Sequence, residues 1–512
     1  MVLCMDFKKI LMIGSAAIFL LGTTKEIDAK EKLHPKELLL PKIPGNPQEG
    51  DGFGQSVCLN GRFAFVSSPF AEPNSVVNSG AIYVYKQEGS VWKNTQIITT
   101  GGAIDNLGLL NIVSQGNWLI FSAPGTPLGS FSNDIISNQN FTGAAIVYHL
   151  NEKTGQWELR QTITRNSKGL SNLTPVNPLV FGQPGLTLEL EQGANFGLSM
   201  SLDIEKKVLL VGAETQQFRT IQGNSVINAG AVYAFALDED KKKWVLEQTI
   251  TNPDGISPNN AFGFSIATHK HLALIGTGSW ILGLASDEIP KPVNSAAYLY
   301  QYQKKEKRWK FVQKIIGDQV GPSTNTLASG LTSIGDAFGS SLALSGSHAV
   351  IGAGQETQAK TSILRGAVYF YKITKKNGKP YLQFQKKFFS DSTNSYAFAL
   401  TAVALRGKCA LVGDPVRTGP LGARQGAVLI YQLKEDKWKH TGTRYNTFGE
   451  APFSCFGSSI SMGQDHVIVG QNPTNNLFFD ALFNLAPLSP YFAGGQGNTP
   501  TGKAVIFKRV RS

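Results

Sequence analysis

A glycine-rich stretch near the start of the chain is the first place where the sequence could do chemistry. Residues 50–54 read GDGFG, and a loop of this kind binds phosphate when it opens a helix whose N-terminus faces the anion. The residues that follow, QSVCLNGRFAFVSSP (55–69), predict two strands and a tight turn instead. We therefore expect no nucleotide site. We expect Phe53 to pack between structural units and Gly54 to let neighbouring backbones approach.

Histidine offers one candidate metal site. His269 and His271 alternate along a predicted strand and could share an ion, but no third ligand accompanies them. The sequence has no nucleophile elbow, no cysteine–histidine pairing and no HExxH motif. Acidic residues are scattered without an evident pair, although loops from distant segments can assemble a site. The sequence therefore predicts no catalytic residue, no metal and no cofactor, and a non-enzymatic role is the expectation.

An aromatic segment near the C-terminus is the candidate ligand-binding region. Residues 471–501 carry five aromatic side chains at Phe478, Phe479, Phe483, Tyr491 and Phe492. Exposed together, they would form a surface for a partner or ligand. Alternatively, the segment folds over the middle of the molecule and buries itself, with a short helix within 476–485. Both interpretations stay open.

The composition favours a strand-rich exported protein. The 512 residues include 54 glycines, 42% hydrophobic residues and only 16% charged residues, which is typical of folded, strand-rich chains. The net charge of +12 would favour weak attraction to an anionic surface, such as a membrane or an acidic glycan. Nucleic acid is not an expected partner. Three cysteines beyond residue 29 are far apart, so we expect buried thiols rather than a disulfide framework: Cys58, Cys409 and Cys455.

The N-terminus resembles an export signal. Lys8 and Lys9 precede an apolar run from Ile10 to Leu21, which is too short to span a bilayer. We expect residues 1–29 to be a signal peptide, with an N-terminal anchor helix as the alternative. The destination could be the periplasm, the cell surface or the medium.

Three sequence blocks recur along the rest of the chain. The first block begins seven times, near residues 53, 107, 196, 262, 338, 398 and 456. A second block, such as GAIYVY or GAVYFY, also occurs seven times, starting at residues 80, 143, 230, 295, 366, 426 and 502. A third block, such as WKNTQIIT, occurs only six times, starting at residues 92, 157, 244, 309, 381 and 438.

The repeat predicts a closed ring of sheets. The first block contains two strands joined by a tight turn, and polar turns join the second block to the third. Each unit is therefore a four-stranded antiparallel meander. Seven such units predict an all-β, seven-bladed β-propeller over residues 30–512. A solenoid would need polar capping units, and none is evident. We expect a monomer.

The missing seventh copy of the third block predicts how the ring closes. Residues before the first Phe-Gly align with the outer strand of the other units. We therefore expect residues 36–43 to supply the outer strand of the last blade, beside 503–509. This pairing would remove the free edges that an open ring leaves.

Connection lengths predict two unequal faces. Links from second to third strand are long, as are the links between blades at 165–195 and 317–337, whereas the other turns are short. The long second-to-third links are 70–79, 125–142, 214–229, 277–294, 354–365, 415–425 and 471–501. Both long classes emerge on one face of an antiparallel meander, which is where binding is expected, although loops also tolerate insertion without function.

Lysine clusters fall on the predicted outer strands and their hairpins, at 240–244, 304–310, 375–379 and near the C-terminus. Lysine on an exposed edge strand blocks pairing with another chain. Attraction to an anionic surface is the functional alternative.

The pattern resembles the FG-GAP repeat family, which includes the N-terminal propellers of integrin α subunits. The Phe-Gly start, the small residues that end the second strand (as in 122–124), and the Gly-Ala-x-Tyr-x-Tyr third strand carry the resemblance. Integrin-type repeats place an Asp-rich calcium loop in several first hairpins. The matching turns here, such as LNGR and SGSH, lack those oxygen ligands. The chain therefore looks like a metal-free bacterial type.

The resemblance implies a protein–protein or adhesion module that binds through the long-loop face. This implication rests on fold analogy. A carbohydrate-binding or glycan-active propeller is the alternative, because loop aromatics suit sugar stacking. A structural envelope protein is a third class.

Overall fold

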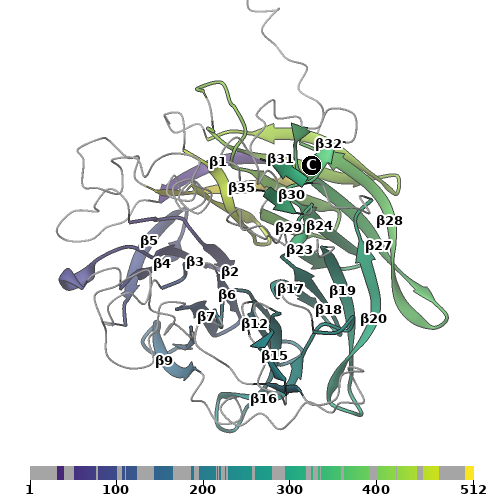
Figure 1. Ribbon diagram of the computed structural model, residues 1–512. Coiled ribbons are helices and arrows are strands. Elements are labelled where there is room, and N and C mark those ends of the chain that lie inside the picture. The colour runs from purple at the N-terminus through teal and green to yellow at the C-terminus, as the bar shows by residue number, and fades with distance from the viewer. Residues whose placement is uncertain are drawn as a thin grey trace, which may run out of the picture.

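The computed structural model contains a ring of seven sheets (Figure 1). It describes residues 31–39, 51–76, 79–100, 107–109, 111–123, 143–164, 186–188, 195–214, 216, 218–220, 225–226, 229–256, 260–278, 295–318, 324–326, 332–334, 336–358, 363–390, 402–422, 424–446, 454–471 and 502–511.

Each of the seven sheets has four antiparallel strands, and we number these blades in chain order. Blade 1 contains β2 (Val57–Asn60), β3 (Phe63–Ser68), β4 (Ala81–Glu88) and β5 (Val91–Ile98). Blade 2 contains β6 (Ile112–Gln115), β7 (Trp118–Ser122), β8 (Ala145–Asn151) and β9 (Gln156–Ile163). Blade 3 contains β11 (Met200–Asp203), β12 (Val208–Ala213), β15 (Ala231–Asp238) and β16 (Lys243–Ile250).

Blade 4 contains β17 (Phe262–His269), β18 (Leu272–Thr277), β19 (Ala296–Gln303) and β20 (Arg308–Ile316), and blade 5 contains β23 (Phe338–Ser345), β24 (His348–Ala353), β27 (Ala367–Lys376) and β28 (Lys379–Phe389). Blade 6 contains β29 (Ala402–Arg406), β30 (Cys409–Asp414), β31 (Ala427–Lys434) and β32 (Lys437–Arg444). Blade 7 contains β33 (Phe456–Met462), β34 (His466–Gln471), β35 (Lys503–Arg511) and β1 (Glu31–Leu39).

Smaller elements accompany the blades. These are the sheet of β10 (Leu186–Leu188), β13 (Phe218–Thr220) and β14 (Ser225–Val226), the pairs β21 (Thr324–Thr326) with β22 (Thr332–Ile334) and β25 (Thr357–Gln358) with β26 (Ile363–Leu364), and the 3₁₀ turn η1 (Pro73–Ser75). The first strands of neighbouring blades contact one another around the whole ring, from β2 through β33 and back to β2. The predicted seven-bladed β-propeller is therefore confirmed. No helix in the part of the chain described above is long and apolar enough to cross a membrane.

The N-terminal strand completes blade 7, as predicted. β1 pairs antiparallel with β35, from Glu31 opposite Arg511 to Leu39 opposite Ala504. Leu33 is 4% exposed and packs in the core shared by blades 6 and 7. The two ends of the propeller are thus held together without a covalent link.

The predicted bounds of this strand are wrong at its start. The strand begins at residue 31 rather than 36, and residues 40–43 lie outside the described part of the chain. Pro35 explains the difference. Proline lacks an amide hydrogen, so within sheets it is found mainly on edge strands and at bulges, and Pro35 lies on an edge strand at the register shift between Pro35 and Glu37. The strand continues through it.

The cores lie between blades, and Phe53 has its predicted place there. Phe53 is 1% exposed and shares a cluster with Tyr83 of blade 1 and with Ile468 and Ile506 of blade 7. Its ring meets that of Tyr83 edge-on at 5.2 Å between centroids. The equivalent phenylalanine of blade 4, Phe262, is likewise buried between blades 3 and 4.

Glycines let the backbones of neighbouring blades touch. Gly230 at the start of β15 has a φ of +79°, and a Cβ there would lie 2.2 Å from the carbonyl oxygen of Phe262. A Cβ at Gly54 would lie 2.2 Å from the carbonyl oxygen of Lys503 in blade 7. Both distances are far shorter than van der Waals contact, so only glycine fits. The expectation for Gly54 is confirmed.

A glutamine bridge links the outer strands of successive blades. The Oε1 of Gln248 in blade 3 accepts a hydrogen bond from the amide of Trp309 in blade 4 at 2.7 Å, and its Nε2 donates to the carbonyl of Trp309 at 3.2 Å. The same two-bond arrangement joins Gln96 to Trp157, Gln161 to Trp244 and Gln313 to Leu382. These bridges satisfy backbone groups on the open edge of each outer strand.

We expect the substitution Gln248→Ala to lower the free energy of unfolding by about 1–2 kcal/mol, because two hydrogen bonds to the backbone are lost. Urea unfolding measures the change. Gln383→Ala, at an exposed glutamine on the outer strand of blade 5, is the matched control and should leave stability unchanged. Equal stability of both variants would show that the bridge contributes nothing.

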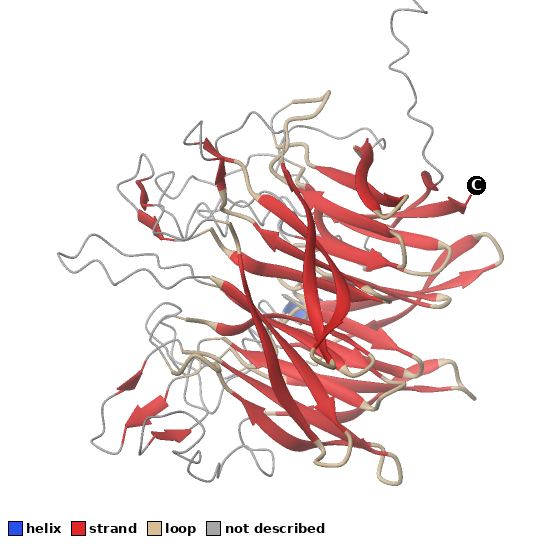
Figure 2. Ribbon diagram, turned by 90° about the vertical axis from the view of Figure 1, so that its right-hand side faces the viewer, coloured by secondary structure: helices blue, strands red, loops and turns tan. Residues whose placement is uncertain are grey.

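The two faces of the ring differ in how strands are joined (Figure 2). On the hairpin face, short turns join first to second and third to fourth strands, such as 61–62 and 89–90. Second and fourth strands end on the opposite face, which we call the long-loop face. Most of the long links predicted there lie outside the described residues.

Candidate functional site

The aromatic side chains predicted to bind a ligand cannot be placed. Phe478, Phe479, Phe483, Tyr491 and Phe492 all lie in 472–500, outside the described residues, as does the helix expected within 476–485. They remain predictions. The candidate site is therefore built from the parts of the long-loop face that the structure describes.

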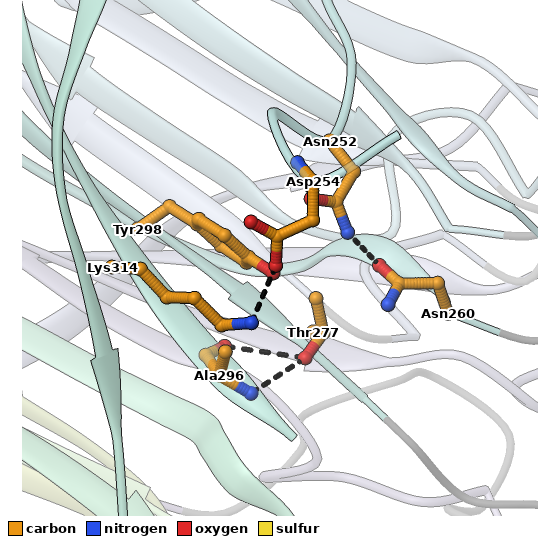
Figure 3. A network of polar contacts seen from close by, with 7 residues as sticks. All are labelled: Asn252, Asp254, Asn260, Thr277, Ala296, Tyr298 and Lys314. Carbon is orange, nitrogen blue, oxygen red and sulfur yellow. Dashed lines mark hydrogen bonds and ion pairs between the residues drawn. The ribbon is translucent and has the colours of Figure 1, made fainter. Parts of the chain in front are cut away.

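A polar network joins the link before blade 4 to that blade (Figure 3). Asp254 lies in the link, and its Oδ2 accepts hydrogen bonds from the Tyr298 hydroxyl at 2.7 Å and the Lys314 ammonium at 2.5 Å. Tyr298 comes from the third strand and Lys314 from the fourth, directly opposite each other. Beside them, Asn252 donates to Asn260 at 2.5 Å, which fixes the shape of the link.

Blade 5 repeats this arrangement with one more acid. The Lys387 ammonium contacts Asp318 at 2.9 Å and Glu356 at 2.8 Å. The Tyr369 hydroxyl donates to Glu356 at 2.6 Å and accepts from the amide of Asp318 at 3.3 Å. Tyr369 and Lys387 again lie opposite each other on the third and fourth strands. The carboxylate that meets both the tyrosine and the lysine is therefore Asp254 of the preceding link in blade 4 and Glu356 of the second-to-third link in blade 5, where the carboxylate of Asp318 meets the lysine alone.

An exposed phenylalanine ring extends each network. In blade 4, the Phe311 ring lies 6.2 Å from that of Tyr298 and 5.9 Å from that of Tyr300. In blade 5, the corresponding distances are 6.2 Å from Phe384 to Tyr369 and 5.8 Å from Phe384 to Tyr371. Phe311 is 43% exposed and Phe384 is 50% exposed.

We call these two groups the rim sites. The blade 4 rim site consists of Asp254, Tyr298, Tyr300, Phe311 and Lys314, and the blade 5 rim site of Asp318, Glu356, Tyr369, Tyr371, Phe384 and Lys387. Other blades have different residues at these places. The position of Phe311 and Phe384 is taken in blades 1, 2, 3, 6 and 7 by Asn94, Leu159, Leu246, His440 and Pro35. The position of Lys314 and Lys387 is taken in the same blades by Ile97, Thr162, Thr249, Thr443 and Leu38. Phenylalanine and lysine therefore occur together only in blades 4 and 5.

The pKa shifts in the blade 5 rim site keep Lys387 and Tyr369 protonated, so both can donate hydrogen bonds to Glu356. Burial raises the pKa of Glu356, and the hydrogen bonds from Lys387 and Tyr369 oppose that rise. Burial alone would lower the pKa of Lys387, but its contacts with Glu356 and Asp318 raise it, so the ammonium stays charged at neutral pH. Burial and the nearby Glu356 raise the pKa of Tyr369, so its hydroxyl keeps its proton and donates.

Two further buried carboxyls lie at the long-loop face. Asp336, just before β23, has a pKa raised to about 6 by burial, with Phe338 donating its amide at 3.0 Å. Glu214, just after β12, is 6% exposed, and burial raises its pKa to about 8 against the opposing effect of a hydrogen bond from Asn195. Such shifts often mark functional sites, although buried structural groups show them too.

We expect Glu214→Gln to stabilise the protein at high pH. The pKa of the Glu214 carboxyl rises from 4.5 to about 8 on folding, so the carboxyl binds its proton more tightly in the folded state. As the pH rises between those two values, the folded protein therefore loses stability relative to the unfolded chain. The variant should match the native protein at pH 4.5 and exceed its free energy of unfolding by a few kcal/mol at pH 8.5. Glu205→Gln, at an exposed glutamate, is the control. Urea unfolding measures the free energy of unfolding of each protein across this pH range. Parallel pH curves for native protein and Glu214→Gln would contradict the assignment.

The histidine pair does not gain a third ligand. His269 and His271 lie at the turn between β17 and β18, on the hairpin face. Within the described ranges, no group of three or more His, Cys, Asp or Glu side chains could hold a metal ion. The three cysteines are buried and lie outside any disulfide, as expected: Cys58, Cys409 and Cys455.

Three of the four predicted lysine clusters lie at the outer hairpins of blades 3, 4 and 5, on the hairpin face. The prediction is wrong for the C-terminal cluster, which lies on β35, the third strand of blade 7, between β34 and the outer strand β1. Two of their lysines form ion pairs with acids of the same hairpin, Lys241 with Asp238 at 3.0 Å and Lys310 with Glu306 at 2.6 Å. Pairs this exposed contribute little to stability. Their position on edge strands agrees with a role in preventing edge-to-edge association.

Comparisons with known proteins assign no family to this chain. No protein-family model matches the chain, and no curated protein matches it in sequence. A Bacteroides uniformis protein provisionally assigned as a 6-phosphogluconolactonase has a similar shape, with a TM-score of 0.42 and 9% identity over 77% of this chain and 85% of that one. A Lactobacillus plantarum protein has a TM-score of 0.41 and 8% sequence identity, over 78% of this chain and 85% of that one.

A Bacteroides fragilis protein with the same provisional assignment gives a TM-score of 0.38 and 10% identity, over 77% of this chain and 82% of that one. Likeness at this level does not carry an activity to this chain. The fold stands on the order of strands in its own sheets, which makes the chain a seven-bladed β-propeller.

Proposed function

We propose that this chain is a non-catalytic binding scaffold of the FG-GAP type, which holds a protein or glycan partner at its long-loop face. One observation carries the proposal. Short turns close the hairpin face, whereas at the opposite face links and strands bring an acid, tyrosines, a lysine and an exposed phenylalanine together, as in the blade 4 network. Variable loops on a rigid scaffold are a common way to build a binding surface.

Adhesion-type binding to a protein is the first form of this proposal, supported by the repeat pattern and by the apolar N-terminal run that favours export. A glycan partner is the second form, and the two rim sites favour it. Both forms place the partner on the same face. The excess of basic residues would add weak attraction to an anionic cell surface.

Binding of the full chain to arrayed cell-surface proteins and glycans tests the proposal. We expect replacement of Phe478, Phe479 and Phe483 by Ser, on the predicted binding segment, to weaken capture at least tenfold. A matched variant with Ser at Lys304, Lys305 and Lys307 alters the hairpin face and should bind normally. If only the Lys304, Lys305 and Lys307 variant loses binding, the partner binds at the hairpin face and the proposal is overturned.

A further inference from the structure

We propose that the two rim sites are equivalent subsites for a neutral, hexose-containing glycan. This inference deepens the proposed function, because it names a ligand class for part of the long-loop face. It starts from internal repetition. Two neighbouring blades place a link acid, two tyrosines, an exposed phenylalanine and a lysine in matching positions. The blades that lack the phenylalanine also lack the lysine, so the set is present or absent as a unit.

The exposed rings supply the apolar half of the site. A hexose ring has a face of C–H groups that packs against a flat aromatic ring, and large aromatics provide such contact area at small entropic cost. Phe311 and Phe384 are the exposed members of three-ring groups in which two tyrosines hold them from below. The tyrosines are buried and fix the position of the phenylalanine before any ligand arrives.

The ion pairs supply the polar half. Sugar hydroxyls both donate and accept hydrogen bonds, so they need acceptors and donors side by side. Lys314 with Asp254, and Lys387 with Asp318, offer one of each next to the rings. The Lys387 ammonium lies 5.2 Å from the centre of the Tyr369 ring, and that of Lys314 lies 5.9 Å from the centre of the Tyr298 ring.

Charge balance selects a neutral sugar over an acidic one. Each lysine of the rim sites is already paired with a carboxylate, and Lys387 is paired with two. No unpaired cation therefore remains among the described rim-site groups to bind a sulfate or a uronic acid. A neutral sugar can instead share the existing donors and acceptors without breaking the pair.

The repetition also sets the expected strength of binding. A single shallow site with one exposed ring binds a free monosaccharide weakly. Two sites on one molecule can hold two residues of a branched or surface-attached glycan, and linked sites gain apparent affinity by a factor of 10²–10⁴. The glycan is therefore expected to be multivalent or densely displayed.

The test uses the full chain on an array of neutral hexose glycans at high density, with sialylated and sulfated glycans as the anionic arm. We expect native protein to bind neutral glycans. Phe311→Leu and Phe384→Leu keep an apolar cover over the tyrosines but remove the flat ring. Each is expected to weaken apparent affinity about tenfold or more, and the double variant should lose binding.

Leu159→Ser is the matched control, since Leu159 is 58% exposed at the same strand position of blade 2. It should bind like native protein, and equal melting temperatures of the variants check folding. Unchanged neutral-glycan binding by the double variant would overturn the inference, as would binding confined to the anionic arm. If the double variant keeps its neutral-glycan binding while the Phe478, Phe479 and Phe483 variant loses capture of an arrayed partner, the proposed function survives and only the inference fails.

Discussion

Removing residues 31–39 is expected to destabilise the whole propeller by at least about 4 kcal/mol, the upper end of what single substitutions cause. The deletion takes away the outer strand of blade 7 and the buried Leu33. It also leaves β35 as a long unpaired edge, which promotes association between chains. Thermal unfolding and size-exclusion chromatography of the deletion and native proteins measure both effects.

A rearranged chain provides the control. Because β1 and β35 are antiparallel and Glu31 lies opposite Arg511, residues 31–39 can be moved behind residue 512 through a short turn. Blade 7 would then have the same third-to-fourth hairpin as the other blades. We expect this variant to regain native stability. A deletion that melts like native protein, or a rearranged chain as unstable as the deletion, would contradict the closure mechanism.

The substitution Gly230→Ala is expected to cost about 3 kcal/mol or more, because the added methyl group would lie 2.2 Å from the carbonyl oxygen and 2.3 Å from the amide nitrogen of Phe262. Backbone atoms on both sides cannot move without separating blades 3 and 4. Denaturant unfolding monitored by tryptophan fluorescence measures the loss.

Gly346→Ala separates crowding from backbone strain. Gly346 lies in the β23–β24 turn with a φ of +60°, and a Cβ there meets nothing within 4 Å. This variant should lose only about 1 kcal/mol, the cost of a left-handed conformation for alanine. Similar losses at both positions would mean that close contact between blades is not the reason for glycine at 230.

The sequence was sufficient for the architecture because the repeat is periodic. Seven first blocks, five of which start with Phe-Gly, and seven third strands predict seven blades, and the absent seventh outer strand predicts closure by the N-terminus. The start of β1 was missed because the alignment with the other outer strands begins at residue 36, after Pro35. Only the pairing with β35 shows that the strand continues through the proline, at a register shift.

The glutamine bridges and rim sites were not predicted, although traces of both are in the sequence. The spacing W-x-x-x-Q occurs at Trp92, Trp157, Trp244 and Trp309, but the glutamine acts on the next blade, which a repeat seen alone does not reveal. The short runs FVQK and FQKK mark the rim sites. Their chemistry depends on a link acid some 60 residues away in blade 4, as the Lys314–Asp254 contact shows.

The closure of blade 7 has a consequence for how the chain folds. Blades 1 to 6 each consist of one continuous stretch, so each can form as soon as that stretch is available. Blade 7 joins residues 31–39 to 504–511, the largest sequence separation among the described strand pairs. Contacts this distant form slowly because the loop entropy is lost before the contact stabilises the fold. We therefore expect β1 to pair with β35 after the other blades have formed, and completion of the ring to be the slow step of folding.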